Sequence, residues 1–167
     1  MIVVLMGVSG SGKTTIGEAI HAQTGAVFAD ADDYHPAANK AKMAAGHPLN
    51  DEDRQPWLEM LNRLMSGWSQ AGTDGVLACS ALKEKYRATL GNGLPPDALH
   101  FVLLDAPKET IAGRLAARQH EYMNPKLLES QLATLERSDD TYTVVNDKTP
   151  VQVAAEIVQH VGRSGKG

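Results

Sequence analysis

Cysteine is nearly absent from this chain, which has a single one, Cys79, among 167 residues. One cysteine cannot form an internal disulfide, and so low a content is typical of proteins from a reducing compartment. No histidine or cysteine stands at metal-ligand spacing from Cys79. We therefore expect Cys79 to be a small buried residue of the core rather than a metal ligand.

Long apolar runs and an excess of positive charge are also missing. The N-terminus has no basic segment, and its opening apolar run is far too short for a signal peptide or a membrane helix. A net charge of −4 and a pI near 5.8 disfavour nucleic acid and anionic membranes as partners. With 43% hydrophobic residues, the chain is expected to be globular and cytoplasmic, with residues 1–167 as a single domain.

The strongest motif is a glycine-rich loop behind a short apolar run. Ile2–Met6 is rich in β-branched residues and predicts a buried parallel strand. The next eight residues fit G-x-x-x-x-G-K-[ST] at every fixed position, in the strand–loop–helix order that disfavours a chance match. The motif predicts a nucleotide site in which backbone N–H groups surround phosphates, Lys13 reaches the outer phosphates and Thr14 binds Mg²⁺. Its residues are Gly7, Val8, Ser9, Gly10, Ser11, Gly12, Lys13 and Thr14.

Acidic residues follow the second predicted strand, Ala26–Ala29. The segment Asp30–Pro36 reads Asp-Ala-Asp-Asp-Tyr-His-Pro. The carboxyl ends of parallel strands are where open α/β sheets bind ligands, which favours Asp30 and Asp32 as site residues. The third predicted strand ends in Ser80 rather than in aspartate, so Asp30 is the candidate for the carboxylate beside the metal. Asp33 is left open between a site residue and a solvated turn.

Cationic side chains occur near the same predicted edge. Arg54 stands in the first turn of a helix capped by Asn50, and Lys83 and Arg87 lie one turn apart after the third strand. A surface ion pair is the alternative for Arg54, and solvated surface charge is the alternative for the other two. Their position favours the binding of an anion.

A second group of cations precedes a polar segment. Arg114 and Arg118 lie one turn apart on a helix that begins at Pro107, and Gln119–Pro125 follows. We expect this segment, about 119–125, to be a mobile lid, with Arg114 on the nucleotide and Arg118 acting in catalysis. A solvated basic face is the alternative for both arginines.

Strand and helix patterns alternate along the whole chain. This alternation predicts an α/β fold, with a five-stranded parallel sheet and helices on both faces. The predicted strands are Ile2–Met6, Ala26–Ala29, Val76–Cys79, Phe101–Asp105 and Thr143–Val145.

From Met6 to about Glu136 the chain resembles the gluconokinases, small P-loop kinases related to shikimate and nucleotide kinases. The most specific stretch is Pro48–Leu58, which reads PLNDEDRQPWL. The resemblance implies a P-loop fold like that of the nucleoside monophosphate kinases. It rests on Gly7–Thr14, Asp30–Pro36, Lys42-Met43, Gly46, Pro48–Leu58, Cys79–Lys83, Tyr86-Arg87 and Ser130-Gln131.

The resemblance implies transfer of the γ-phosphoryl group of ATP to the 6-hydroxyl of D-gluconate, with Mg²⁺ as cofactor. It places Asp30 near the metal and Asp32 at the acceptor hydroxyl, which agrees with the needs of a loose phosphoryl transition state. The family commonly has histidine in the lid where this chain has Glu121, so that contact does not transfer. The implied substrate-binding residues are Asp32, His35, Arg54, Lys83, Arg87 and Gln131, with one cation on the carboxylate of gluconate.

The sequence alone leaves two other functions open. The first is another small-molecule kinase, acting on shikimate, a nucleoside monophosphate or a sugar. The second is a nucleotide-binding switch, disfavoured by the missing aspartate after the third strand and by the lack of an obvious water-orienting glutamine. The sequence does not decide the oligomeric state, for which a homodimer is one candidate.

Overall fold

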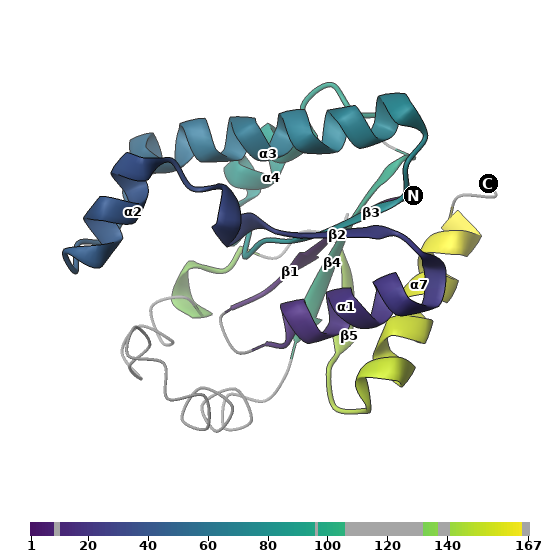
Figure 1. Cartoon of the computed structure of the whole chain (residues 1–167). Coiled ribbons are helices and arrows are strands. Elements are labelled where there is room, and N and C mark those ends of the chain that lie inside the picture. Colours follow the sequence, from purple (N-terminus) through teal and green to yellow (C-terminus); the bar gives the residue numbers. More distant parts are fainter. Residues whose placement is uncertain (9–10, 96, 106–131, 137–140, 165–167) are drawn as a thin grey trace.

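The structure is a computed structural model that describes residues 1–8, 11–95, 97–105, 132–136 and 141–164. Its five strands form one parallel sheet in the order β2-β3-β1-β4-β5, with β1 at the centre (Figure 1). This confirms the predicted five-stranded parallel sheet. The strands are β1 (Ile2–Met6), β2 (Val27–Asp30), β3 (Gly75–Ala78), β4 (Leu99–Asp105) and β5 (Tyr142–Val145).

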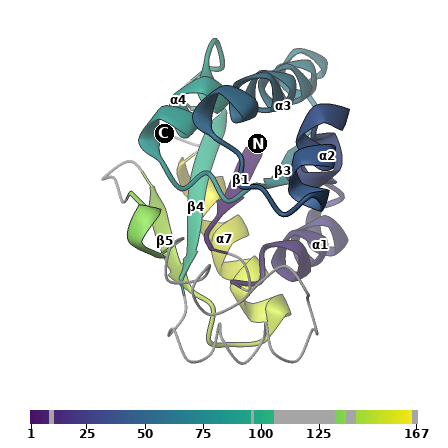
Figure 2. The same ribbon diagram turned by 90° about the vertical axis from the view of Figure 1, so that its left-hand side faces the viewer.

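Helices cover both faces of the sheet, as predicted. In Figure 2, α3 and α4 lie on one side of the strands and α1 and α7 on the other. The short helix α2 projects beyond the N-terminal end of α3 in Figure 1. No helix among the described residues is long and apolar enough to cross a membrane. The helices are α1 (Lys13–Thr24), the 3₁₀ helix η1 (Ala31–Tyr34), α2 (Ala37–Ala44), α3 (Asp51–Ala71), α4 (Glu84–Gly91) and α7 (Pro150–Ser164).

The central strand β1 is buried along its whole length because both of its faces are covered. Successive side chains of a strand point to opposite faces, so β1 contributes to two cores. Ile2, Val4 and Met6 pack with α3 and α4, whereas Val3 and Leu5 pack with α1 and α7. Cys79 is a member of the first core and is 2% exposed, as expected for a small core residue.

The long helix α3 begins after Asn50, as the sequence predicts. The Asn50 side chain accepts from the Asp53 N–H while the Asp53 carboxylate accepts from the Asn50 N–H, a reciprocal cap. Near its end α3 lies so close to β3 that a Cβ on Gly75 would come within 2.3 Å of the Trp68 ring. Strand boundaries differ slightly from the prediction, because β2 begins one residue later and β4 two residues earlier.

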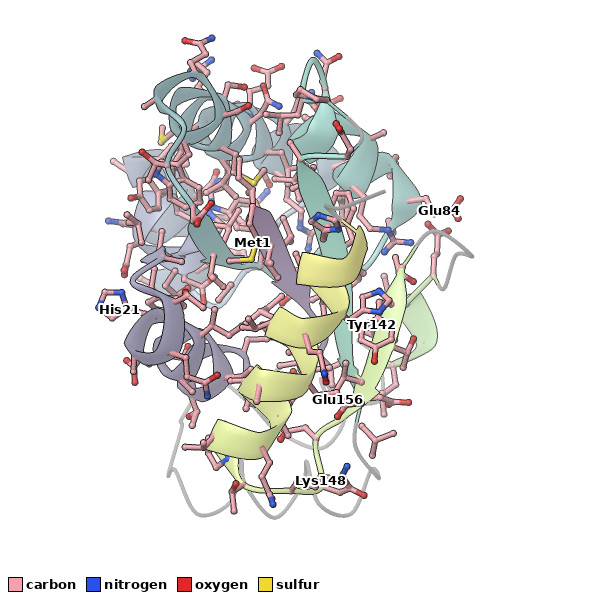
Figure 3. All side chains as sticks on the ribbon, turned by 90° about the vertical axis from the view of Figure 1, so that its right-hand side faces the viewer. Met1, His21, Glu84, Tyr142, Lys148 and Glu156 are labelled. Carbon is pink, nitrogen blue, oxygen red and sulfur yellow. The ribbon has the colours of Figure 1, made fainter. Side chains whose placement is uncertain are left out.

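Helix α7 lies in front of the sheet in the view of Figure 3. Tyr142 of β5 and Glu156 of α7 lie beside each other there, with 3.5 Å between the phenol oxygen and the carboxylate. The Tyr142 ring stacks on His160 at 3.5 Å between centroids, and the amino group of Met1 pairs with Asp74 at 2.8 Å. These contacts hold the ends of the sheet and the last helix together.

Candidate active site

The loops that follow β1, β2 and β3 meet at one edge of the sheet. All strands are parallel, so their carboxyl ends share this edge, and both Leu5 and Asp30 are in register with Ala78. The Gly7 N–H donates to the Ser80 carbonyl at 3.3 Å, which joins the first loop to the third. The edge therefore collects the glycine-rich loop, the acidic loop and the Lys83 segment, as predicted.

The described part of the glycine-rich loop curls around the Lys13 side chain. The Lys13 ammonium donates to the carbonyls of Gly7 (2.9 Å) and Val8 (3.1 Å). Gly7 has φ 141°, and a Cβ there would come within 2.7 Å of the Ser11 hydroxyl, so glycine is required. The loop ends at the N-terminus of α1, where backbone N–H groups and the helix dipole favour an anion.

An asparagine that follows the edge strand β5 also holds the glycine-rich loop. Asn146, just after β5, is 5% exposed, and its side-chain amide donates to the Ser11 carbonyl at 2.7 Å. The Asn146 N–H donates to the Asp105 carbonyl at 2.7 Å, which fixes the residue against β4. No sequence pattern indicates this role of Asn146, because only the strand order brings β5 within reach of the loop.

Two oxygen ligands predicted for the metal lie side by side. The Thr14 hydroxyl donates to Asp30 Oδ2 at 3.4 Å, and Asp30 Oδ1 accepts from the Asp32 N–H at 2.9 Å. The second contact caps η1 and directs the carboxylate toward α1. Mg²⁺ prefers oxygen ligands, and usually only one or two of them come from the protein. The Thr14 hydroxyl and the Asp30 carboxylate, beside a phosphate loop, fit this preference.

Asp32 projects from η1 into the open edge of the sheet. Its side chain is 85% exposed to water. Partial desolvation within the acidic loop nevertheless raises the pKa of Asp32, and the Asp30 carboxylate raises this pKa further. A carboxyl group with a raised pKa is a better proton acceptor than a free aspartate, which suits the predicted role at the acceptor hydroxyl.

His35 lies behind Asp32 rather than in the open. Its side chain is only 6% exposed, and its ring stacks on Trp57 with centroids 4.2 Å apart. Nε2 of His35 lies 3.9 Å from Asp32 Oδ1. Burial lowers the pKa of His35, so the ring is neutral near neutral pH.

A cationic cluster surrounds Tyr86; it consists of Arg54, Lys83 and Lys85 together with the Asp51 carboxylate. Arg54 donates to the Tyr86 hydroxyl at 3.0 Å, and this hydroxyl donates to Asp51 Oδ1 at 2.6 Å. The ammonium groups of Lys83 and Lys85 lie 5.6 and 5.9 Å from the centre of the Tyr86 ring. Lys85 bonds Asp51, and Lys83 lies 3.8 Å from it. Three cations thus share one carboxylate.

Arg87 differs from the other predicted cations because it is 5% exposed. Its guanidinium donates to the carbonyls of Ala81 (2.7 Å) and Glu136 (2.6 Å). Ala81 has φ 45°, which is strained for a residue with a side chain, and the Arg87 bond helps to hold it. These contacts give Arg87 a structural role beside the Lys83 segment, and its contact with substrate stays a prediction.

Several predicted site residues lie outside the described residues. They are Ser9 and Gly10 of the glycine-rich loop, Arg114, Arg118, Gln131, and the predicted lid 119–125 with Glu121.

The Asp51 contacts predict a pH-dependent stability. The hydrogen bond from Lys85, followed by that from Tyr86, lowers the pKa of Asp51 to about 2. A lowered pKa stabilises the folded state above the ordinary value of 3.8 and loses this effect as the pH falls toward 2. We therefore expect Asp51→Asn to lower the melting temperature near neutral pH and to match the wild type near the acid end of that window.

Thermal unfolding across a pH series measures this difference. Glu52→Gln is the matched control, because it removes an exposed carboxylate from the same helical turn. A gap between wild type and Asp51→Asn that persists unchanged to the acid end would contradict the assignment.

The chain is similar to a protein-family model, to known proteins and to solved structures. The AAA domain family model matches residues 2–144. A probable gluconokinase of Dictyostelium discoideum is 48% identical over 140 residues, which cover 81% of this chain and 70% of that protein. Two of the similar solved structures illustrate the match, which extends over nearly the full length of each chain. The gluconokinase of Sinorhizobium meliloti 1021 has a TM-score of 0.84 at 35% identity, over 98% of this chain and 93% of that one. Shikimate kinase from Aquifex aeolicus has a TM-score of 0.62 at 19% identity, over 100% and 99%, and shows a shared fold.

Proposed function

This chain belongs to the AAA domain family and to the gluconokinases, and from this premise we propose how its residues transfer the γ-phosphoryl group of ATP to the 6-hydroxyl of D-gluconate. The products are 6-phospho-D-gluconate and ADP. The observation that carries the proposal is the meeting of Lys13, the Thr14–Asp30 pair and Asp32 at one sheet edge, beside a cluster with surplus positive charge.

The nucleotide phosphates bind the glycine-rich loop and the N-terminus of α1. We propose that Lys13 leaves the carbonyls of Gly7 and Val8 to contact the outer phosphates, because a phosphate oxygen is a stronger acceptor for an ammonium than a carbonyl. Thr14 and Asp30 would hold Mg²⁺. When bound, this ion neutralises charge on the phosphate oxygens. Arg114 and Arg118 remain our candidates for further phosphate contacts.

Asp32 receives the proton of the acceptor hydroxyl. As the bond between O6 of gluconate and the γ-phosphorus forms, the bond from that phosphorus to the leaving oxygen of ADP breaks, and the O6 proton passes to the Asp32 carboxylate. Asp30 is occupied by the Thr14 hydroxyl and the Asp32 N–H. Asp32 is therefore the carboxylate of the pair that faces the acceptor.

The carboxylate of gluconate binds the cationic cluster. Arg54 and Lys83 are one-third exposed, so they are held in place by the protein and still open to a ligand. The cluster has three cations and one carboxylate, a surplus of two positive charges that an anionic substrate would reduce. His35, Arg87 and Gln131 stay predicted substrate-binding residues.

This assignment predicts strong selection for an acidic polyol. Gluconate should exceed sorbitol and glucose by at least about 10²-fold in kcat/KM, because a neutral ligand leaves the cluster unpaired. Lys83→Met should raise the KM for gluconate about tenfold and leave the KM for ATP unchanged, since one charge-assisted contact is lost.

Initial rates with each acceptor measure both effects. Arg63→Met is the control, because Arg63 is an exposed cation in the middle of α3. Comparable kcat/KM values for glucose and gluconate would remove the carboxylate from the recognition scheme.

The function itself is tested by ADP release with a panel of acceptors. Gluconate is expected to give rapid turnover, whereas shikimate, nucleoside monophosphates and glucose are expected to give little. A preference for one of the other acceptors would replace gluconate as the substrate. Slow hydrolysis that no acceptor stimulates would favour a nucleotide switch.

We also propose that the enzyme acts in the cytoplasm, with residues 1–167 as one kinase domain. A homodimer stays a prediction, which sedimentation analysis of the purified protein tests.

A further inference from the structure

The packing around His35 fixes the plane of its ring. The imidazole lies nearly parallel to the indole of Trp57, with an angle of 14° between the two planes. The Trp57 N–H donates to the Ala31 carbonyl at 2.7 Å, so the stacking partner is itself tied to the start of η1. What the stacking does not decide is which ring nitrogen carries the proton.

Asn39 supplies that information. This residue of α2 is 5% exposed, and its Nδ2 lies 2.9 Å from the Asp53 carbonyl oxygen. A carbonyl oxygen only accepts, so the amide nitrogen must face it; a flipped amide would bring two acceptors together. The same nitrogen lies 3.4 Å from Nδ1 of His35. One N–H thus points to Asp53 and the other to the ring, so Nδ1 is an acceptor.

From these contacts we infer that Asn39 is a positioning residue that keeps the proton of His35 on Nε2, where the N–H faces the Asp32 carboxylate. The separation of 3.9 Å between Nε2 and Asp32 Oδ1 is longer than a hydrogen bond, so the interaction is an electrostatic attraction across a short gap. The inference rests on the proposed role of Asp32 in proton transfer.

The alternative tautomer would have the opposite effect on Asp32. With the proton on Nδ1, the lone pair of Nε2 would face the carboxylate and repel it. Burial lowers the pKa of His35, so the ring has a single N–H near neutral pH and its position matters. Loss of Asn39 should therefore lower kcat, with little change in the KM for ATP.

The tautomer is measured directly by ¹⁵N NMR of the imidazole nitrogens. The chain has six histidines, and the His35 signals are identified by their loss in His35→Gln. We expect a protonated Nε2 and an unprotonated Nδ1 in the wild type, and a shift toward the other tautomer in Asn39→Leu. A protonated Nδ1 in the wild type would overturn the inference, whatever the enzyme's activity.

Two replacements of His35 separate the positions of its nitrogens. Glutamine places an amide N–H close to the position of Nε2, whereas asparagine places one close to Nδ1. We expect kcat of His35→Gln to exceed that of His35→Asn by about tenfold, the effect of one favourable polar contact. Melting temperatures of the two variants control for folding. Equal kcat values in variants of equal stability would overturn the inference.

A double-variant cycle tests whether Asn39 acts through the ring. Asn39→Leu should lower kcat about tenfold in the wild type but less than about threefold in His35→Gln, because a glutamine amide has no tautomers. An equal loss in both backgrounds would mean that Asn39 acts through the Asp53 carbonyl, and the positioning role would be withdrawn.

Discussion

Replacement of Lys13 by methionine is expected to lower kcat/KM by about 10²- to 10³-fold, the usual effect of removing a group that stabilises transition-state charge. Methionine keeps much of the length of the side chain and removes its charge. In the described structure the ammonium already lies inside the loop, on the carbonyls of Gly7 and Val8. It therefore reaches the phosphates by a short movement rather than by a large rearrangement.

The fold should survive this change. Two hydrogen bonds to loop carbonyls are lost, each of which contributes about 1 kcal/mol. Steady-state kinetics with gluconate saturating, together with melting temperatures, separate catalysis from stability. Lys40→Met is the matched control, since Lys40 is an exposed lysine of α2. A loss below about tenfold in a folded Lys13→Met protein would remove Lys13 from the phosphate site.

The features that the sequence predicted correctly depend on neighbours in the chain. One local unit contains β1, the glycine-rich loop and α1. The G-x-x-x-x-G-K-[ST] motif predicts this strand–loop–helix order from neighbouring residues alone. The cap of α3 needs only Asn50 and Asp53, three residues apart. The predicted ends of the strands were less accurate, because pairing with a neighbouring strand decides where a strand ends. Leu99, for example, belongs to β4 because it pairs with Ile2 of β1, and local composition does not encode this pairing.

The parts of the site that were missed depend on distant segments. The sequence places Asp51 only in the first turn of α3, yet its carboxylate accepts a hydrogen bond from Tyr86, which is 35 residues away. No sequence motif includes Asn39, whose contact with the Asp53 carbonyl, 14 residues away, forms only on folding. Arg87 was predicted from its position after β3, but its burial comes from contact with the Glu136 carbonyl, 49 residues away. No local pattern records such contacts.

The second large effect is expected for Asp32→Asn, which should lower kcat by about 10²-fold or more, in line with the contribution of a general base. The amide keeps the shape of the side chain and cannot accept the hydroxyl proton. ATP binding should survive, because the phosphate contacts come from the loop and from α1. The raised pKa of Asp32 also predicts the direction of a pH effect. Because only the ionised carboxylate accepts the proton, wild-type activity should fall with decreasing pH at a pH above 3.8, the ordinary pKa of aspartate.

Asp30→Asn should behave differently, although it removes the same charge two residues away. Asp30 contacts the Thr14 hydroxyl, so its loss should raise the Mg²⁺ concentration needed for half-maximal activity. Asp33→Asn, an exposed residue of the same loop, controls for the general loss of negative charge. Rates measured over a range of Mg²⁺ and pH for the three variants separate the roles. If Asp32→Asn shifted the Mg²⁺ requirement while Asp30→Asn lowered kcat at saturating Mg²⁺, the two carboxylates would have to exchange their assignments.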